Sequence, residues 1–229
     1  MRVVLFGATG MVGQGVLREC LRDDRVTRVL AVGRRPTGVA HAKLAELVRR
    51  DLFDWADADD ALAGDGPYDA CLFCLGVSAA GMREADYVRT TYDLTLAAAS
   101  ALARLHPGMT FVYVSGQGTD ATERGRAMWA RVKGRTENAL RGLPFRAAYM
   151  MRPGIIQPVD GARSATAWYR ALYALLGPAL PLLRRTFPEQ IVTTSELGRA
   201  MLAVARDGHA HPVLESRDIA ARARASAGG

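Results

Sequence analysis

The sequence predicts an α/β fold in which helices cover both faces of a doubly wound parallel sheet, as a single domain with a small C-terminal extension on the substrate side. Short β-like runs alternate with helix-length segments along most of the chain. The first of these runs leads directly into a glycine-rich turn. The length of 229 residues suits one compact domain that needs neither a disulfide nor a metal to hold its core together.

The expected strands are short and mostly apolar, as in a sheet that is buried on both faces. They are Arg2–Phe6, Arg28–Val32, a run near Leu47–Leu52, Tyr68–Leu75, Thr110–Val114, Phe145–Met151 and the short run Pro212–Glu215. The expected helices lie between them, at Gly10–Arg22, Arg83–Leu105, Arg124–Arg141 and Ser195–Arg206. We expect residues 1–219 to form the domain, with 155–219 as its substrate-side cap region. Residues 220–229 are small and polar, which predicts a frayed tail.

Composition and charge indicate an ordinary globular protein with an anionic small ligand. The formal charge is +7, yet the basic residues are scattered, with no basic run and no interleaved aromatic residues. We therefore expect no nucleic acid as a partner. The start, Met1–Gly7, has neither the apolar run nor the cleavage site of a secretory signal, which predicts a cytoplasmic protein.

Cysteines and histidines give weaker indications. Cys71 and Cys74 form a C-x-x-C, but within an expected strand and not at a helix start, where the dipole would lower a thiol pKa. Buried strand cysteines are therefore favoured over a redox pair. His209 and His211 form an H-x-H without an acidic or cysteine cluster to complete a metal site, so we expect no metal.

The turn after the first strand is suited to a dinucleotide. Gly7, Gly10 and Gly13 follow that strand and open the first helix. Glycine permits the tight turn, the close approach of backbone to a pyrophosphate and the packing of helix on sheet. The helix start adds free N–H groups and a partial positive charge. Because strand, turn and helix occur in this order, we predict a Rossmann-type NAD(P) site. The alternative is a glycine turn that binds nothing.

The end of the second strand indicates which dinucleotide binds. An acidic residue there would hydrogen-bond the ribose 2′-hydroxyl of NAD, but the strand ends in Gly33-Arg34-Arg35-Pro36. A guanidinium can hold a 2′-phosphate through paired hydrogen bonds. We therefore expect NADP(H) in preference to NAD(H). The alternative is that one arginine stacks on the adenine or points into solvent.

Four further segments end expected strands or lie on a following helix. They are Cys74-Leu75-Gly76-Val77-Ser78, Tyr113-Val114-Ser115-Gly116, Trp129-Ala130-Arg131-Val132-Lys133-Gly134 and Arg152-Pro153-Gly154. Ligands of an open parallel sheet bind beyond the carboxyl ends of its strands, where all four would lie. With the glycine turn, this order resembles the atypical short-chain dehydrogenase/reductases. The similarity is greatest to Tat-interacting-protein-like oxidoreductases and to bacterial chains labelled NAD-dependent epimerase/dehydratase, and it runs from residue 1 to about 215.

The resemblance implies roles for individual residues. Ser115 would orient a substrate carbonyl, Lys133 would bind the nicotinamide ribose, and Asp51 would lie beside the adenine. Where the family often has an asparagine in the long helix, this chain has Thr90 and Thr91. The turn motif and the resemblance together imply contacts to the dinucleotide from Gly7, Thr9, Gly10, Met11, Val12, Gly13, Arg34, Arg35, Asp51, Leu52, Leu75, Gly76, Lys133, Pro153 and Gly154.

One departure from the family pattern concerns catalysis. The tyrosine expected four residues before Lys133 is replaced by Trp129. A tyrosine beside a lysine can donate or accept a proton, whereas an indole N–H is a hydrogen-bond donor only. Carbonyl reduction should then be slow unless another group, with Tyr87 and Tyr92 as candidates, takes the place of the tyrosine. Alternatively, Trp129 simply packs against the cofactor or the core.

The most hydrophobic stretch, residues 165–183, leaves two alternatives open. Arg170 and two prolines argue against a membrane-spanning helix. The stretch suits either a cap over the substrate pocket, which would favour a small apolar substrate, or contact with a membrane surface or a protein partner. Two functions are therefore expected: an NADPH-dependent oxidoreductase or epimerase-like enzyme on an apolar carbonyl compound, or an NADP(H)-sensing protein whose chemistry has lapsed with Trp129.

Overall fold

The centre of the protein is a seven-stranded parallel sheet in the order β3-β2-β1-β4-β5-β6-β9. The computed structural model describes residues 1–56, 59–64, 66–162 and 190–226. The strands of the sheet are β1 Arg2–Phe6, β2 Arg28–Gly33, β3 Leu44–Val48, β4 Ala70–Phe73, β5 Thr110–Val114, β6 Ala147–Arg152 and β9 Val213–Glu215. The chain moves outward from β1 to β3 and then outward again from β4 to β9. This order confirms the doubly wound sheet predicted from the sequence.

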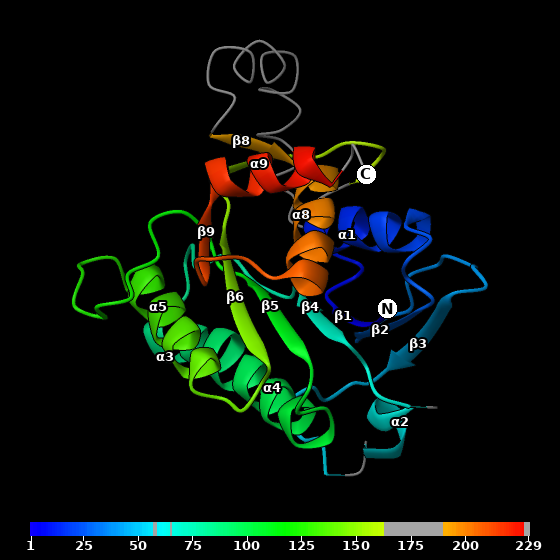
Figure 1. The fold of residues 1–229 in the computed structure, drawn as a ribbon. Coiled ribbons are helices and arrows are strands. Elements are labelled where there is room, and N and C mark those ends of the chain that lie inside the picture. The colour runs from blue at the N-terminus through cyan, green and yellow to red at the C-terminus, as the bar shows by residue number, and fades with distance from the viewer. Residues whose placement is uncertain (57–58, 65, 163–189, 227–229) are drawn as a thin grey trace.

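Helices cover both faces of the sheet (Figure 1). One face carries α1 Met11–Arg22, α8 Thr194–Asp207 and α9 Ser216–Ala225. The other carries α4 Leu94–Leu105 and α5 Met128–Arg141, together with α3 Glu84–Val88 and the short α2 Asp59–Ala63. Between α3 and α4 the helix widens into a π-helix, η1 Arg89–Asp93, so the helix expected over Arg83–Leu105 is continuous but changes its hydrogen-bond register.

Each strand contributes alternate side chains to two separate cores. Val3 and Leu5 of β1 pack with Val16 of α1 and with apolar residues of α8 and α9. Val4 and Phe6 of β1 face the opposite side, where the core contains apolar residues of α4 and α5. Because both faces of the central strands are covered, these strands read as nearly continuous apolar runs.

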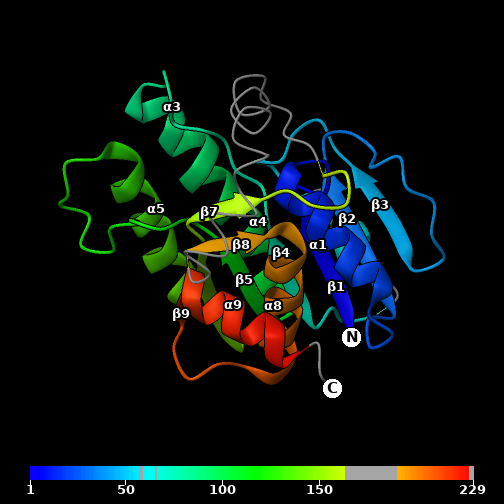
Figure 2. The ribbon, with the colours of Figure 1, turned by 90° about the horizontal axis from the view of Figure 1, so that it is seen from above.

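A second, smaller ladder lies outside the main sheet. β7 Ile155–Gln157 pairs in parallel with β8 Ile191–Thr193, and Figure 2 shows it at the side of the sheet where β6 ends and α8 begins. Thr193 caps α8: its hydroxyl accepts the N–H of Glu196, and the Glu196 carboxylate accepts the N–H of Thr193. The helix expected at Ser195–Arg206 therefore starts one residue earlier and ends one later.

Several sequence expectations require correction. The tail expected at 220–229 is wrong for residues 220–225, which continue α9, because Ala220 and Ala223 pack with Ile219 against α8 and the sheet. The third strand lies at Leu44–Val48, a few residues before the expected run. The helices α2 and α9 and the β7–β8 ladder were not predicted. The apolar stretch 165–183 lies outside the described residues.

The described residues include neither a candidate membrane span nor a cluster of metal-ligating side chains. Over that part of the chain, no helix combines the length and apolar character needed to cross a membrane. Over the same residues, no group of three or more His, Cys, Asp or Glu side chains is placed to hold a metal ion. His209 Nδ1 instead lies 3.0 Å from the carbonyl oxygen of His211.

Candidate functional site

The turn after β1 is built on contacts that only glycine allows. Gly7 has a φ of +80°, and a Cβ atom on it would lie 2.7 Å from the backbone nitrogen of Leu75. Gly10 N–H donates to Gly7 O at 2.9 Å and closes the turn. A Cβ atom on Gly13 would overlap the backbone of Gly7. The three glycines of the predicted motif thus hold the turn tightly against β4 and α1.

The N-terminus of α1 is open in front of this turn. Gly10 is the N-cap and offers no side-chain cap, and no acidic residue stands in the first turn, which Met11 and Val12 begin. The Gln14 side chain donates to Thr9 O at 2.9 Å and steadies the approach to the helix. Uncapped N–H groups and the positive end of the helix dipole favour an anion at this place. The glycine cradle and the bare helix start fit a diphosphate.

The turn lies at the switch point of the sheet. β1 and β4 are neighbours, and Cys74 N–H donates to Phe6 O where both strands end. From this point the chain winds in opposite directions, and open parallel sheets bind their ligands beyond the carboxyl ends of the strands at such a point. Leu75 and Gly76 leave β4 here, and a Cβ atom on Gly76 would meet nothing within 4 Å. The backbone at Gly76 therefore borders open space.

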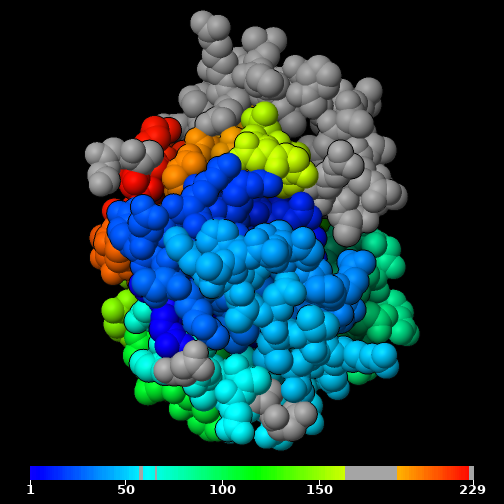
Figure 3. Space-filling model, turned by 90° about the vertical axis from the view of Figure 1, so that its right-hand side faces the viewer, coloured from blue at the N-terminus to red at the C-terminus, as the bar shows by residue number. Residues whose placement is uncertain are grey.

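Two arginines directly follow Gly33, the last residue of β2. Arg34 and Arg35 are exposed, and within the described ranges neither guanidinium has a hydrogen bond or an ion pair. They belong to the N-terminal part of the chain, which forms the face of the molecule seen in blue in Figure 3. Such unengaged guanidinium groups are available to an anion.

The loop after β3 is ordered by its own contacts. The Asp51 carboxylate accepts the N–H of Phe53 at 2.7 Å. Leu52 is buried, and its carbonyl accepts the indole N–H of Trp55, whose ring packs edge-on against Phe6. Asp51 and Leu52 are thereby held beyond the carboxyl end of β3, next to the end of β2.

Lys133 is held at the loop that follows β5. Its ammonium group donates a hydrogen bond to Ser115 O. Burial lowers the pKa of Lys133 to about 8, and the charge of Glu137 opposes this shift in part. A Cβ atom on Gly116 would lie 3.7 Å from Lys133 Nζ, so position 116 has no side chain beside the amine. Gly134 lets the loop approach α5, because a Cβ atom there would overlap Asp120 O.

The Ser115 hydroxyl is engaged within the protein. Ser115 is buried and its Oγ donates to Glu137 Oε1 at 2.5 Å. Arg152 binds the same carboxylate through Nε at 3.0 Å and Nη2 at 2.5 Å. In this arrangement the hydroxyl that the resemblance assigns to a substrate carbonyl is committed to Glu137. Glu137 was not among the residues predicted from the sequence; its signal is an acidic residue four positions after Lys133, on the same helix face.

Trp129 and the two candidate tyrosines differ in burial and in their neighbours. Trp129 is partly buried, and its ring edge would be 3.4 Å from a Cβ atom on Gly118. The guanidinium carbon of Arg135 lies 4.2 Å from the centre of the Tyr92 ring. Arg135 and Lys133 are two residues apart on α5, so their side chains point to opposite sides of the helix. Tyr87 is 1% exposed, in the core beside α5.

The remaining predicted positions lie directly after β6 and in η1. Pro153 O accepts the N–H of Gln117, and Gly154 N–H donates to Ser216 Oγ at 2.7 Å. These bonds tie the segment after β6 to the loop after β5 and to the start of α9. Thr90 and Thr91 lie in η1, and the buried Thr91 hydroxyl has no hydrogen-bond partner in the described part of the chain.

The C-x-x-C cysteines carry free thiols at the end of β4. Cys71 is buried within the strand, and Cys74 follows it. Burial raises the pKa of both thiols well above the ordinary range. A thiol so hard to ionise is a poor nucleophile, which favours the structural interpretation of this pair.

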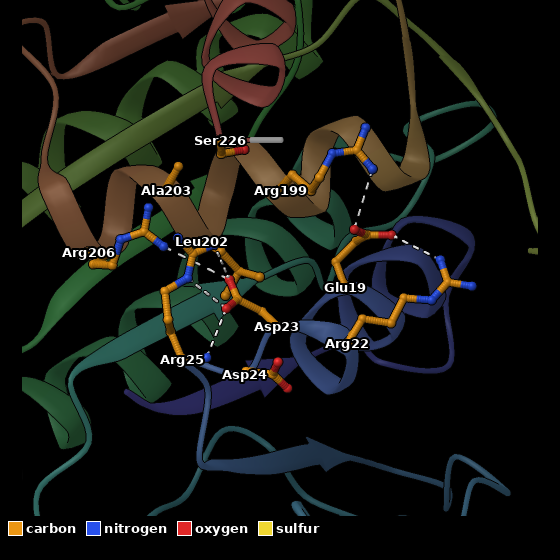
Figure 4. A pocket seen from close by; sticks show the side chains of 10 residues that line it. All are labelled: Glu19, Arg22, Asp23, Asp24, Arg25, Arg199, Leu202, Ala203, Arg206 and Ser226. Atoms are coloured by element: carbon orange, nitrogen blue, oxygen red, sulfur yellow. Dashed lines mark hydrogen bonds and ion pairs between the residues drawn. The ribbon is translucent and has the colours of Figure 1, made fainter. Parts of the chain in front are cut away.

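A charged pocket of about 430 Å³ lies elsewhere, between the C-terminal parts of α1 and α8 (Figure 4). It is lined by Glu19, Arg22, Asp23, Asp24, Arg25, Arg199, Leu202, Ala203, Arg206 and Ser226. Arg22 lies twelve residues along α1 from Gly10, or about 18 Å. Glu19 and Asp23 are each paired with arginines of the same walls. The pocket is therefore remote from the turn after β1, and its charges are largely balanced internally.

Comparison with known proteins agrees with this geometry. Residues 3–123 match the NAD dependent epimerase/dehydratase family. The chain is 32% identical to "Protein fmp52, mitochondrial" of Emericella nidulans over 183 residues, which cover 76% of both proteins. It is 26% identical to the protein of the same name from Chaetomium globosum, with 94% of both covered.

Solved structures share the fold. Bordetella bronchiseptica WbmH, solved in complex with NAD+, superposes with a TM-score of 0.67 at 17% identity, covering 93% of this chain and 74% of that protein. A short-chain dehydrogenase/reductase family oxidoreductase from Burkholderia thailandensis superposes with a TM-score of 0.68 at 17% identity, covering 96% and 92%.

The comparisons correct one expectation and establish the family. The cytoplasmic location expected from the N-terminal sequence is contradicted, because the curated relatives are named as mitochondrial proteins. The family match covers more than half of the chain, and it includes the glycine turn at the switch point of the sheet. The chain belongs to the NAD dependent epimerase/dehydratase family.

Proposed function

We propose that the chain binds NADPH across the switch point of its sheet. The observation that carries this proposal is the glycine cradle of Gly7, Gly10 and Gly13 in front of the uncapped start of α1. The preference for NADPH over NADH rests on Arg34 and Arg35, which stand exposed and without protein partners within the described ranges. Paired hydrogen bonds from a guanidinium suit the 2′-phosphate that distinguishes the two dinucleotides.

The remaining site residues support the nicotinamide half. In this proposal Lys133 binds the ribose hydroxyls through its ammonium group, and the backbone of Pro153 and Gly154 flanks the nicotinamide ring. Asp51 and Leu52 border the adenine end. A bound nicotinamide supplies or accepts a hydride; what the chain contributes is the orientation of the carbonyl compound and the handling of its proton.

For the chemistry, we propose an oxidoreductase or epimerase-like reaction on a small apolar carbonyl compound. The apolar character of residues 165–183, known from the sequence only, supports such a substrate. A second candidate, an NADP(H)-sensing protein without turnover, is favoured by two observations. Trp129 replaces the proton-donating tyrosine, and the Ser115 hydroxyl is held by Glu137.

Two measurements test these proposals. Calorimetry with NADPH, NADP+, NADH and NAD+ should show binding, at least about tenfold tighter for the phosphorylated pair, as expected for one charge-assisted contact. No heat with any dinucleotide on folded protein would refute the binding proposal. Oxidation of NADPH against a panel of aldehydes, ketones and quinones separates enzyme from sensor: turnover supports the enzyme, and binding without turnover across the panel supports the sensor.

A further inference from the structure

Ser115 forms hydrogen bonds with one acidic and one basic side chain from the same face of α5. Its hydroxyl donates to the carboxylate of Glu137, and its carbonyl oxygen accepts from the ammonium group of Lys133. Lys133 and Glu137 are four residues apart on α5, so their side chains lie on the same face of the helix. The opposite charges therefore meet the same residue of the loop after β5.

Glu137 also contacts the residue at the carboxyl end of β6. It is 2% exposed, and its carboxylate is bridged by Arg152, the residue immediately before Pro153 and Gly154. Arg152 in turn lies 3.4 Å from the carboxylate of Glu215 at the end of β9. One buried carboxylate thus connects the carboxyl ends of β5, β6 and β9 to α5. A carboxylate with this set of donors has little freedom to move.

We infer that Glu137 is a positioning residue of the dinucleotide site: its charge keeps the ammonium group of Lys133 seated on the Ser115 carbonyl, and its oxygen keeps the Ser115 hydroxyl inside the protein. The inference rests on the proposed function for what the site binds. The alternative is that Glu137 serves only as the buried partner of Arg152 and has no influence on Lys133.

The other charged and titratable groups around Glu137 set the expected signs. Arg152 of β6 carries the opposite charge and partly cancels the effect of Glu137 on Lys133. Tyr113 of β5 stays neutral, since burial raises its pKa far above the ordinary range, and Tyr87 of α3 lies beside it. The ion pair of Arg131 with Glu84 of α3 stands at 2.8 Å and is balanced. Glu137 is therefore the group whose removal should weaken the hold of Lys133 on its proton.

The chain offers a clean readout because Lys43 and Lys133 are its only lysines. Lysine labelled with ¹³C at the ε carbon gives two signals, and Lys43→Arg assigns them. Titration without any dinucleotide should place the Lys133 midpoint near pH 8, since burial lowers its pKa to about 8. Lys43, whose Nζ donates to Leu21 O and Asp23 O in another part of the fold, serves as the internal reference.

Glu137→Gln should lower the proton affinity of Lys133 about tenfold, a shift of about one pH unit downward. A purely structural role predicts the opposite sign, because loosened packing would solvate Lys133 and raise its midpoint. Glu137→Asp should return the midpoint toward the wild-type value. Glu19→Gln is the matched control, since Glu19 is also buried and paired with two arginines but lies on α1; it should leave Lys133 unchanged.

Arg152→Gln provides a second test should Glu137→Gln fail to fold. It removes the cancelling positive charge, so the Lys133 midpoint should rise. Arg152→Lys keeps the charge but loses the paired contacts, so it should leave the midpoint near the wild-type value, whereas loosened packing would raise the midpoint in both variants. An unchanged or raised midpoint in folded Glu137→Gln, or an unchanged or lowered one in Arg152→Gln, overturns the inference. Calorimetry at pH 7.5 should then show NADPH binding weakened several-fold by Glu137→Gln. If the wild type binds no dinucleotide, the proposed function fails, while the titration still decides the role of Glu137.

Discussion

Gly13 of α1 packs so closely on Gly7 that a Cβ atom at position 13 would overlap the carbonyl oxygen of Gly7. This contact sets the distance between the first helix and the turn that precedes it. The turn in turn lies against the backbone at Leu75, where β4 ends. The dinucleotide cradle is therefore part of the packing of α1 on the sheet and not a separate loop.

Gly13→Ala should accordingly damage both stability and binding. Within a helix, replacing glycine with alanine normally gains about 1 kcal/mol. Here the methyl group would collide with backbone, and overpacking of this kind costs about 1–3 kcal/mol, or a Tm lower by roughly 5–10 °C. NADPH should bind at least about tenfold more weakly. Gly108→Ala is the control, because a Cβ atom there meets nothing within 4 Å; equal behaviour of the two variants would contradict the prediction.

Arg34→Ala should change the choice of cofactor. A charge-assisted contact to the 2′-phosphate contributes about 1.5–3 kcal/mol, so NADPH affinity should fall about 10- to 100-fold. NADH, which lacks that phosphate, should bind as before within about twofold. The measurement is calorimetry at fixed low salt, with Arg217→Ala, an exposed arginine on α9, as the control for net charge. An equal loss of affinity for NADPH and NADH would show that Arg34 does not bind the 2′-phosphate.

Much of the fold could be predicted because its signals are local. β1 and β5 have the predicted bounds, since each is an apolar run that ends at glycine or polar residues. β3 was misplaced because it is an edge strand whose half-exposed side chains do not form a continuous apolar run. α9 was missed because Ile219, Ala220 and Ala223 provide only a small apolar face among arginines.

The glycine turn of the candidate site could be predicted from the sequence, but its buried charged pair could not. The tight turn at Gly7, Gly10 and Gly13 was predictable because the strand, the turn and the helix are contiguous in the sequence. Glu137 resembles any solvated helical glutamate until Arg152, fifteen residues later on β6, is brought beside it. The π-helix likewise depends on backbone register, which no pattern of apolar residues reveals.

Ser115→Ala should lower stability without weakening cofactor binding. The Ser115 hydroxyl donates to the buried Glu137 carboxylate, and losing a hydrogen bond to a charged group costs about 1.5–3 kcal/mol, or roughly 5 °C in Tm. Because that hydroxyl is committed to the interior, NADPH affinity should stay within about twofold. Ser100→Ala, at an exposed position of α4, is the matched control. A large loss of turnover with unchanged stability would instead assign Ser115 to the substrate.

Trp129→Tyr should increase turnover by supplying the missing phenol. A tyrosine one helical turn before Lys133 has its pKa lowered by the nearby ammonium group and can then exchange a proton with a carbonyl oxygen. General acid–base assistance is worth about 10²–10⁴ in rate, so NADPH oxidation should rise by up to about that factor. Trp129→Phe removes the indole without adding a hydroxyl. If both variants behave alike, the gain comes from space near Gly118 and not from proton transfer.

The pH dependence of cofactor binding should follow Lys133. Burial lowers its pKa from 10.5 to about 8, so the ammonium group is present below pH 8 and lost above it. NADPH affinity should therefore fall as the pH rises through about 8, and Lys133→Met should remove this dependence while Lys43→Met retains it. Stability should change in the opposite direction. Between about pH 8 and 10.5 the unfolded chain holds the proton that the folded protein has released, so this group makes unfolding less favourable as the pH rises. A wild-type affinity that is flat from pH 7 to 9, measured by calorimetry on folded protein, would mean that Lys133 does not touch the dinucleotide.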